Sequence, residues 1–430
     1  MSKFRKMGLV AAMEADEEIL EAPADETEVA LDVSETSAEV ADEVEEVESA
    51  ETSIDDATDD LETLGSIQAV MADSVESGEG LDEQAAEIAE IAVEAICARL
   101  GIKTAGRIMP ATESFGSVTT RVAATKIALE AVEEKSKTIM ESVKAAWAWI
   151  WQKIKEFIGK FTGNIEALEK QAGVLKTKLA AAKDYVPKDQ AAELKDESVV
   201  KAFTVSGKFA PSEVLKGHVK LAAETTGLLD VTEKAVEEIS ASIKTAMTPD
   251  PVKADDFAKL VSSKLEGIRD AFGGAAGIGP LINGGKVKIG LDKDANGDTT
   301  SFTVNVVSET QNTVKSAKFL SVSEAESLLA ELETLLKSIR DYKAIEDRVK
   351  KLETSVIGKL TGAIKDFKDS QSAHERKVIK QINTSSSAVN KVVTKAALSF
   401  PGMNLSAARS ALSFIAKSLA SLEAPAAAKE

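Results

Sequence analysis

The sequence WAWIWQKIKEFIGKF, at residues 147–161, decides the fold class of this 430-residue chain. Its large apolar side chains recur at spacings of three and four, as Trp147, Ile150, Trp151, Ile154, Phe157, Ile158 and Phe161. That period places them on one face of an α-helix. The helical pattern extends back to Val122, so we predict one long amphipathic helix over 122–161 that holds all three tryptophans.

The apolar stripe of this helix, represented by Trp147, Trp151, Phe157 and Phe161, has two interpretations. It can form the core seam of a helical bundle. It can instead lie in a membrane interface, with lysines directed towards the headgroups; these are Lys144, Lys153, Lys155 and Lys160. We favour the core seam, while Trp149, which falls off the main stripe, keeps the membrane alternative open. No apolar run approaches the roughly 18–20 residues that cross a membrane.

Helical patterns continue on the C-terminal side of the stripe. They cover residues 164–185, 231–246 and 251–272, and a last helix after Asn404 that Pro425 ends. From Ser323 to Val356 the three-four spacing suits a coiled-coil hairpin arm or an extended bundle helix. The pattern predicts a mainly α fold, an extended helical bundle with long coiled-coil-like helices.

One segment has strand character. Residues 286–291 and 300–307 alternate between apolar and polar side chains and are rich in Val, Thr and Ile, which predicts a small β-hairpin. The glycine-rich stretch before it, residues 273–285, is predicted to be a linker.

The hairpin loop DKDANGD, residues 292–298, resembles the first half of a calcium-binding loop, with Gly297 at the sharp turn. The twelfth position is Thr303, which cannot supply the bidentate carboxylate that such loops need. Asx-Gly residues are also what a hairpin turn requires. We therefore predict a turn that does not need calcium.

Other motifs do not predict an active site. The stretch GPLINGGK at 279–286 departs from a P-loop, because Pro280 and Val287 stand where glycine and Ser/Thr are required. The single cysteine, Cys97, excludes an internal disulfide and fits a reducing compartment, and with only two histidines a typical structural zinc site is excluded. We predict no enzyme activity, no cofactor and no metal.

Charge divides the chain into two parts. Residues 7–98 contain no lysine or arginine. Residues 1–113 hold 31 acidic and 6 basic side chains, a net charge of −25, whereas residues 114–430 hold 40 and 46, a net charge of +6. Self-repulsion and weak apolar content predict that the acidic front is largely disordered, with helices near 66–75 and 82–100. In the second helix Ile88, Ile91, Ala95 and Ile96 are expected on one side.

The helical pattern breaks between Ile102 and Gly116, where the charge changes sign. Pro110 favours extended backbone at Met109, and such a stretch between helices is accessible to a protease. The sequence Ala111-Thr112-Glu113 followed by Ser114 lies at this seam.

In this layout, and over the stretch from about Leu64 to Gly163, the chain resembles the internal head proteins, or prohead core proteins, of large tailed bacteriophages. The resemblance implies a prohead protease that cuts after glutamate when a small or aliphatic residue lies two positions earlier. Ala111, Thr112 and Glu113 match these positions, and Ser114 would become the new N-terminus. A second match is Ala12-Met13-Glu14, which would release a short leader.

The resemblance implies a structural virion protein of the capsid interior that loses an acidic propeptide. The regions would be the propeptide 1–113, a helical region 114–272, the linker and hairpin 273–310, and a C-terminal helical region 311–430. Expected partners are the prohead protease, capsid and core proteins, and further copies of the chain, with weak non-specific DNA contact. The chain would be in the host cytoplasm during assembly. The alternatives are a membrane-active amphipathic helical protein delivered to the host, and an acidic-tailed helical scaffold.

Overall fold

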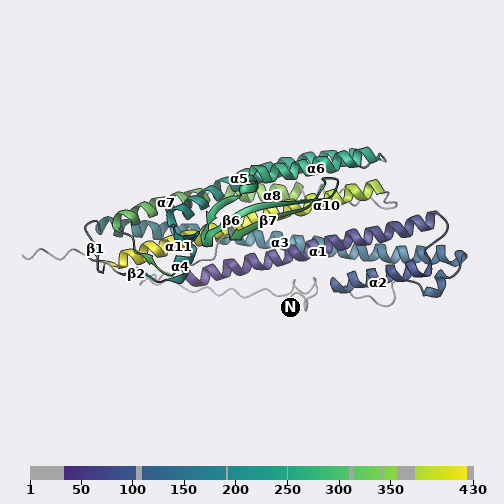
Figure 1. The fold of residues 1–430 in the computed structure, drawn as a ribbon, viewed down its shortest axis with the longest axis horizontal. Helices are drawn as coiled ribbons and strands as arrows, with labels where there is room; N and C mark the ends of the chain where they lie inside the picture. Colours follow the sequence, from purple (N-terminus) through teal and green to yellow (C-terminus); the bar gives the residue numbers. More distant parts are fainter. Residues whose placement is uncertain are drawn as a thin grey trace, which may run out of the picture.

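The computed structural model describes residues 33–102, 109–189, 192–248, 250–308, 314–340, 342–355 and 373–423. The fold is an elongated bundle of long helices with one small sheet on its side (Figure 1). The helices are α1 (Val33–Glu76), α2 (Glu83–Arg99), α3 (Val118–Ala181), α4 (Glu197–Ala202), α5 (Pro211–Ala246), α6 (Pro251–Ala271), α7 (Val322–Arg340), α8 (Tyr342–Ser355), α10 (Ala373–Thr394) and α11 (Phe400–Ala420). The predicted mainly α class is confirmed.

Helix α3 is 64 residues long and includes both helices that the sequence predicted on either side of Gly163. The apolar stripe explains this continuity, since Phe161, Ile165 and Leu168 keep the three-four spacing across the glycine and are all buried. A glycine inside a helix costs only about 1 kcal/mol relative to alanine, which this packing offsets. The helix begins after Ser117, whose Oγ accepts a hydrogen bond from the N–H of Thr120 at 3.4 Å.

Helix α1 is the largest departure from the sequence-based prediction, which gave this region one short helix over 66–75. It spans 44 residues. Its buried apolar residues recur at spacings of three and four over much of its length; they are Val47, Ala50, Ile54, Ala57, Leu64, Ala69 and Met71. Several of these side chains are small, so the period is hard to see among the many acids. The rest of the front that was expected to be disordered, residues 1–32, lies outside the described residues.

Helices α1 and α3 lie side by side and antiparallel (Figure 1). Val47 and Ile54 share a core with Trp151 and other residues of the second half of α3. Leu64 and Met71 share a separate, smaller core with residues of its first half. Midway along this smaller core, Gln68 Nε2 donates a hydrogen bond to Ser136 Oγ at 2.9 Å.

Helix α2 completes the smaller core, and with the ends of α1 and α3 it forms an arm beyond the other helices (Figure 1). The prediction of this helix is confirmed, with Asp82 as its N-cap. The side that carries Ile88, Ile91 and Ala95 is not the buried one, because Ile88 and Ile91 are about three-fifths exposed and Ala95 is exposed as well. The buried face consists instead of Ala86, Ala89, Val93, Ile96 and Cys97, as expected from the close approach that small residues allow. Burial raises the pKa of the Cys97 thiol.

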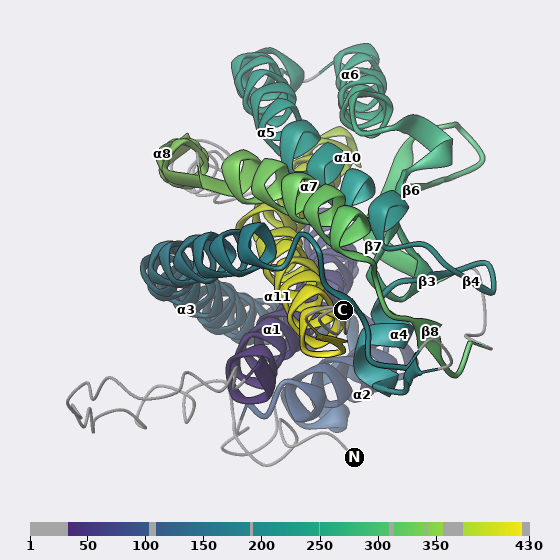
Figure 2. The ribbon, with the colours of Figure 1, turned by 90° about the vertical axis from the view of Figure 1, so that its left-hand side faces the viewer.

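Helix α11 lies at the centre of the main bundle, surrounded by α1, α3, α4 and α7 (Figure 2). It continues α10 through one π-helical segment, Lys395–Ser399. Pro401 lies two residues after the end of this segment, and because proline cannot donate the usual helical hydrogen bond, a local widening of the helix accommodates it. The sequence reading missed α10, whose Ser, Thr, Asn and Gln residues obscure the apolar positions.

The predicted hairpin is confirmed as strands β6 (Gly285–Lys293) and β7 (Thr299–Ser308), antiparallel from the Gly285–Ser308 pair to the Lys293–Thr299 pair. The glycine-rich stretch before it is not a free linker, because residues 278–281 form a third strand, β5 (Ile278–Leu281), beside β6. Three further antiparallel pairs are two residues long on each side: β1 (Val186–Pro187) with β9 (Leu422–Glu423), β2 (Glu193–Leu194) with β8 (Ala317–Lys318), and β3 (Thr204–Val205) with β4 (Lys208–Phe209).

Strand β5 is anchored on α5 through two adjacent residues. Gly217 lies so close to β5 that a Cβ atom there would be 1.8 Å from the carbonyl oxygen of Pro280. Next to it, His218 is fully buried, and its Nε2 accepts a hydrogen bond from the N–H of Ile282 at 3.1 Å. Its Nδ1 lies 2.8 Å from Asn404 Oδ1 on α11. These contacts join the sheet to the centre of the bundle.

Candidate processing site

The seam Ala111–Ser114 lies in a short 3-10 turn, Thr112–Phe115, between α2 and α3. The Ser114 N–H donates to the Ala111 carbonyl oxygen at 2.8 Å, and the Gly116 N–H donates to the Glu113 carbonyl oxygen at 3.2 Å. The turn is anchored by Phe115, whose side chain is fully buried in the arm core.

Arg121 supports the turn from the first part of α3. Its Nε donates a hydrogen bond to the Phe115 carbonyl oxygen at 2.6 Å. The side chain of Glu113 is exposed and Ser114 is half-buried. The Glu113–Ser114 peptide bond is therefore at the surface but held in a closed turn. A protease that binds its substrate in extended form, as strand addition requires, has to open this turn first.

The second predicted site, Ala12-Met13-Glu14, lies outside the described residues. For the predicted site at Glu113, the sequence indicated the break in the helical pattern but not the buried anchor at Phe115. Sequence reasoning also missed the apolar face of α1, whose three-four spacing from Val47 to Met71 was the available signal.

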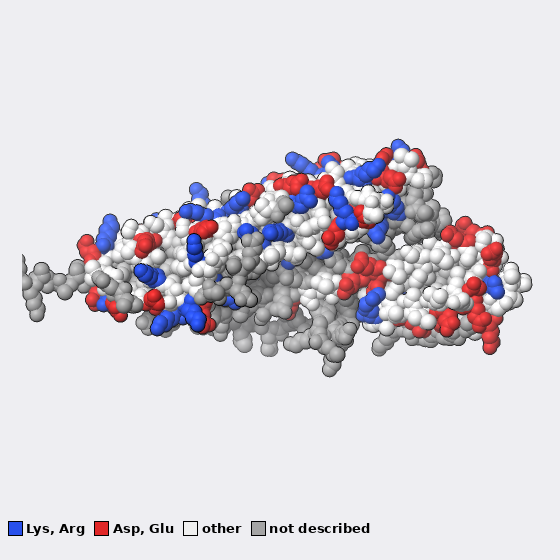
Figure 3. Space-filling view, in the orientation of Figure 1, with Lys and Arg blue, Asp and Glu red and all other residues white. Residues whose placement is uncertain are grey.

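Charge on the described surface follows the division seen in the sequence. Acidic side chains rim the end of the arm, whereas lysine and arginine are interspersed with acids over the rest of this face (Figure 3). Between Val33 and Ala98 the described chain has no basic residue. Arg99 ends this acidic stretch, and it pairs with the buried carboxylate of Asp60 on α1.

The tryptophan stripe lies in the main core. Trp151, Phe157 and Phe161 are each at most 3% exposed, and Trp147 packs, partly buried, against the same cluster. Trp149 is half-buried, with Lys153 Nζ 5.7 Å from the centre of its ring. Among the described helices, none combines the length and the apolar content needed to cross a membrane.

Two carboxylates of the hairpin loop, those of Asp294 and Asp298, bond to groups of the protein itself. Asp294 Oδ1 accepts hydrogen bonds from the N–H groups of Asn296 and Asp298, at 2.9 and 3.0 Å. The Asp298 carboxylate forms an ion pair with Lys377 at 2.9 Å. Within the described ranges, no group of three or more His, Cys, Asp or Glu side chains is arranged to hold a metal ion. That the loop does not need calcium stays a prediction.

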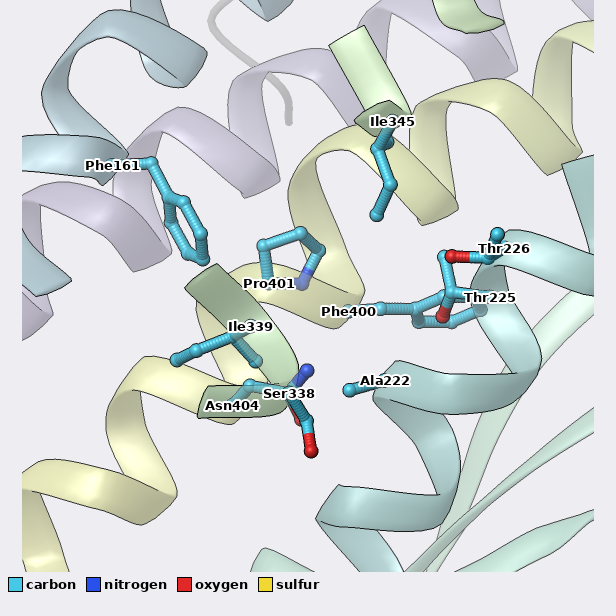
Figure 4. A pocket seen from close by; sticks show the side chains of 10 residues that line it. All are labelled: Phe161, Ala222, Thr225, Thr226, Ser338, Ile339, Ile345, Phe400, Pro401 and Asn404. Atoms are coloured by element: carbon cyan, nitrogen blue, oxygen red, sulfur yellow. The ribbon is translucent and has the colours of Figure 1, made fainter. Parts of the chain in front are cut away.

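A small hollow of about 30 Å³ lies between α3, α5, α7, α8 and α11 (Figure 4). Its lining has no titratable side chain, and its polar groups are the hydroxyls of Thr225, Thr226 and Ser338 and the amide of Asn404. General acid–base chemistry needs a side chain that can exchange a proton near neutral pH. The hollow therefore offers no side chain for general acid–base chemistry.

Comparison with protein families identifies the family of the chain. A family model of phiKZ-like phage internal head proteins matches residues 16–417. The chain belongs to this family of internal head proteins. The match covers the described arm, the seam at Glu113 and the main bundle together, and the predicted resemblance is confirmed. Comparisons with curated proteins and with solved structures found no match.

Membership places this internal head protein in a class of structural phage proteins that lie inside the capsid. Association with capsid and core proteins follows at the level of the family. The helical bundle is consistent with that role.

Proposed function

We propose that this internal head protein is a structural component of the prohead core that is matured by cleavage after Glu113. The main support is that the Glu113 side chain is exposed in a surface turn. This turn lies at the junction between the part of the chain with net charge −25 and the part with net charge +6. The protease that cuts there is the prohead protease, which recognises Glu113 and the small residue Ala111.

The charge difference provides a physical reason for the cut. An acidic front that is part of the chain during assembly competes with nucleic acid for basic side chains. DNA entering the head repels a polyanion, whereas a body with net charge +6 tolerates dense phosphate. Cleavage followed by loss of the front therefore converts an assembly form into a form compatible with packaged DNA. Further copies of the chain and weak, salt-sensitive DNA contacts are the remaining proposed partners.

N-terminal sequencing of the protein from mature heads tests the proposed site. We expect the main N-terminus at Ser114. Phage carrying Glu113→Gln should retain the joined chain, because the protease loses the carboxylate that it recognises. As a control, Glu79→Gln changes another exposed acid in a loop of the arm and should leave the terminus at Ser114. An intact chain, or a terminus elsewhere in wild-type heads, would refute the assignment.

A further inference from the structure

We infer that cleavage after Glu113 does not by itself release the acidic front. The inference rests on the proposed cut and concerns its product, a nicked two-chain complex in which the front stays docked on the body through α1. The docking surface is the face of α3 that α1 covers, together with the parts of α10 and α11 that α1 contacts.

The apolar contacts of α1 extend far from the cut. In its first half, Val47, Ala50 and Ile54 belong to the main core, where they share a cluster with Trp151 and other residues of α3. In its second half, Ala57, Leu64 and Met71 belong to the smaller core of the arm. All six are at most 4% exposed. Breaking the Glu113–Ser114 bond changes none of these contacts.

Polar contacts between the front and the body also stabilise the interface between α1 and α3. Gln68 on α1 donates to Ser136 on α3 at 2.9 Å. In the loop between α1 and α2, the buried N–H of Leu81 donates to Thr125 Oγ1 at 2.9 Å. This loop also lies so close to α3 that a Cβ atom at Gly80 would be 2.6 Å from the carbonyl carbon of Arg121. The front therefore meets the body at several separate points.

Helix α2 remains with α1 after the cut. Its residue Arg99 forms a charge-assisted pair with Asp60 of α1, in which Nε donates to Oδ2 at 3.0 Å. Asp60 is 3% exposed. A buried carboxylate that loses its partner is costly, so the two helices of the front leave the body together or not at all.

The apolar burial that holds the α1–α3 interface together responds differently to salt than the charge repulsion that would separate it. Apolar burial is not weakened by salt, whereas repulsion between the acidic front and packaged phosphate is strong only where screening is low. A nicked complex in simple buffer therefore stays together. Departure of the front also exposes the stripe of α3 around Trp151 to water, which opposes release.

The test uses the full chain with the recognition sequence of a site-specific protease inserted beside Glu113. The purified protein is cut to completion and examined at micromolar concentration by size-exclusion chromatography with light scattering, in 1 M NaCl. We expect both fragments to elute together with the mass of the uncut chain. Separate elution of the two fragments would overturn the inference.

A pair of substitutions on α1 tests whether the α1–α3 interface keeps the cut fragments together. Leu64→Asp places a charge at a fully buried position, whereas the control Val70→Asp places the same charge at a position that is 59% exposed. After cutting, the fragments of Leu64→Asp should separate and those of Val70→Asp should stay together. If the fragments of both variants stay together, or those of both variants separate, the α1–α3 interface is not what holds the front on the body.

A milder variant is needed because the charge buried by Leu64→Asp could unfold the chain. Leu64→Ala typically costs about 2–5 kcal/mol, which corresponds to a dissociation constant weaker by about 30- to 5,000-fold for the nicked complex. Circular dichroism of each uncut variant confirms that the body still unfolds cooperatively. Because the introduced protease replaces the phage enzyme, co-elution here and a native terminus away from Ser114 would be separate results, and only the latter refutes the proposed function.

Discussion

At the scale of single residues, His218 joins three parts of the fold through one imidazole ring. Nε2 accepts from the Ile282 N–H, so the proton of the neutral ring is on Nδ1, which donates to Asn404 Oδ1. Complete burial lowers the pKa of His218 to about 4, and the hydrogen bond with Asn404 offsets only part of this effect. The ring is therefore neutral over the physiological range.

The lowered pKa predicts a pH dependence of stability. Between the unfolded pKa near 6.5 and the folded pKa near 4, the unfolded chain binds the proton more tightly, so the free energy of unfolding falls as pH falls. From pH 7.5 to pH 5 the loss is about 2 kcal/mol. Urea unfolding of wild type and His218→Gln at both pH values measures it. The variant should be less stable at pH 7.5 and show a smaller drop, and an equal drop in both proteins would contradict the assignment.

Gly217 and Gly227 form a matched pair within α5. Gly217→Ala should destabilise by about 1–3 kcal/mol or more, because the new methyl group overlaps the Pro280 carbonyl oxygen. At Gly227 a Cβ atom meets nothing within 4 Å, so Gly227→Ala should stabilise by up to about 1 kcal/mol. Thermal unfolding of the two variants tests the difference in sign. Similar effects at both positions would show that β5 does not approach α5 as described.

At the scale of elements, the helices with large apolar side chains could be predicted from sequence and those with small or polar ones could not. The stripe from Trp147 to Phe161 is unambiguous because each position buries a large surface. Helix α1 buries alanines among acids, and α10 buries Ser385 and Asn390 among apolar neighbours, so their periodicity is weak. The part that α1 contributes to the arm was missed for the same reason.

The strand β5 was missed for a different physical reason. Glycine-rich sequence normally indicates a turn or linker. Here the absence of side chains is what allows two pieces of backbone to meet, as at Gly277, where a Cβ atom would be 2.3 Å from the Val287 carbonyl oxygen. Such close approach depends on a distant partner that sequence spacing does not reveal.

The tryptophan stripe gives a prediction for α3 as an element. Trp151→Ala should lower the free energy of unfolding by about 3–5 kcal/mol, because a side chain that is 3% exposed leaves a cavity in the main core. Trp149→Ala, at a half-buried position two residues away, should cost clearly less. Chemical denaturation followed by circular dichroism measures both. Wild-type tryptophan emission should be blue-shifted without lipid, and a shift only after adding vesicles would favour the membrane alternative.

At the scale of the whole molecule, the charge division predicts how DNA binding changes on maturation. The protein carrying Leu64→Asp provides both forms, as the intact chain and as the body separated after cutting. We expect the body, with net charge +6, to bind DNA weakly at low salt, and the intact chain, with wild-type net charge −19 made more negative by the substitution, to bind more weakly still. Fluorescence anisotropy with a labelled duplex compares them. Equal affinities would mean that the front does not mask the body.

The single unbroken helix α3 also sets the outline of the molecule. Sixty-four residues at about 1.5 Å each give a stiff axis of roughly 96 Å, and α1 reinforces much of it. Stiff, elongated bodies at high concentration exclude less volume to one another when they lie parallel than when they point in random directions. Confinement in a filled head would thus favour a common orientation among many copies, without any specific contact between them. An internal protein with this outline can give orientational order to the space that it occupies.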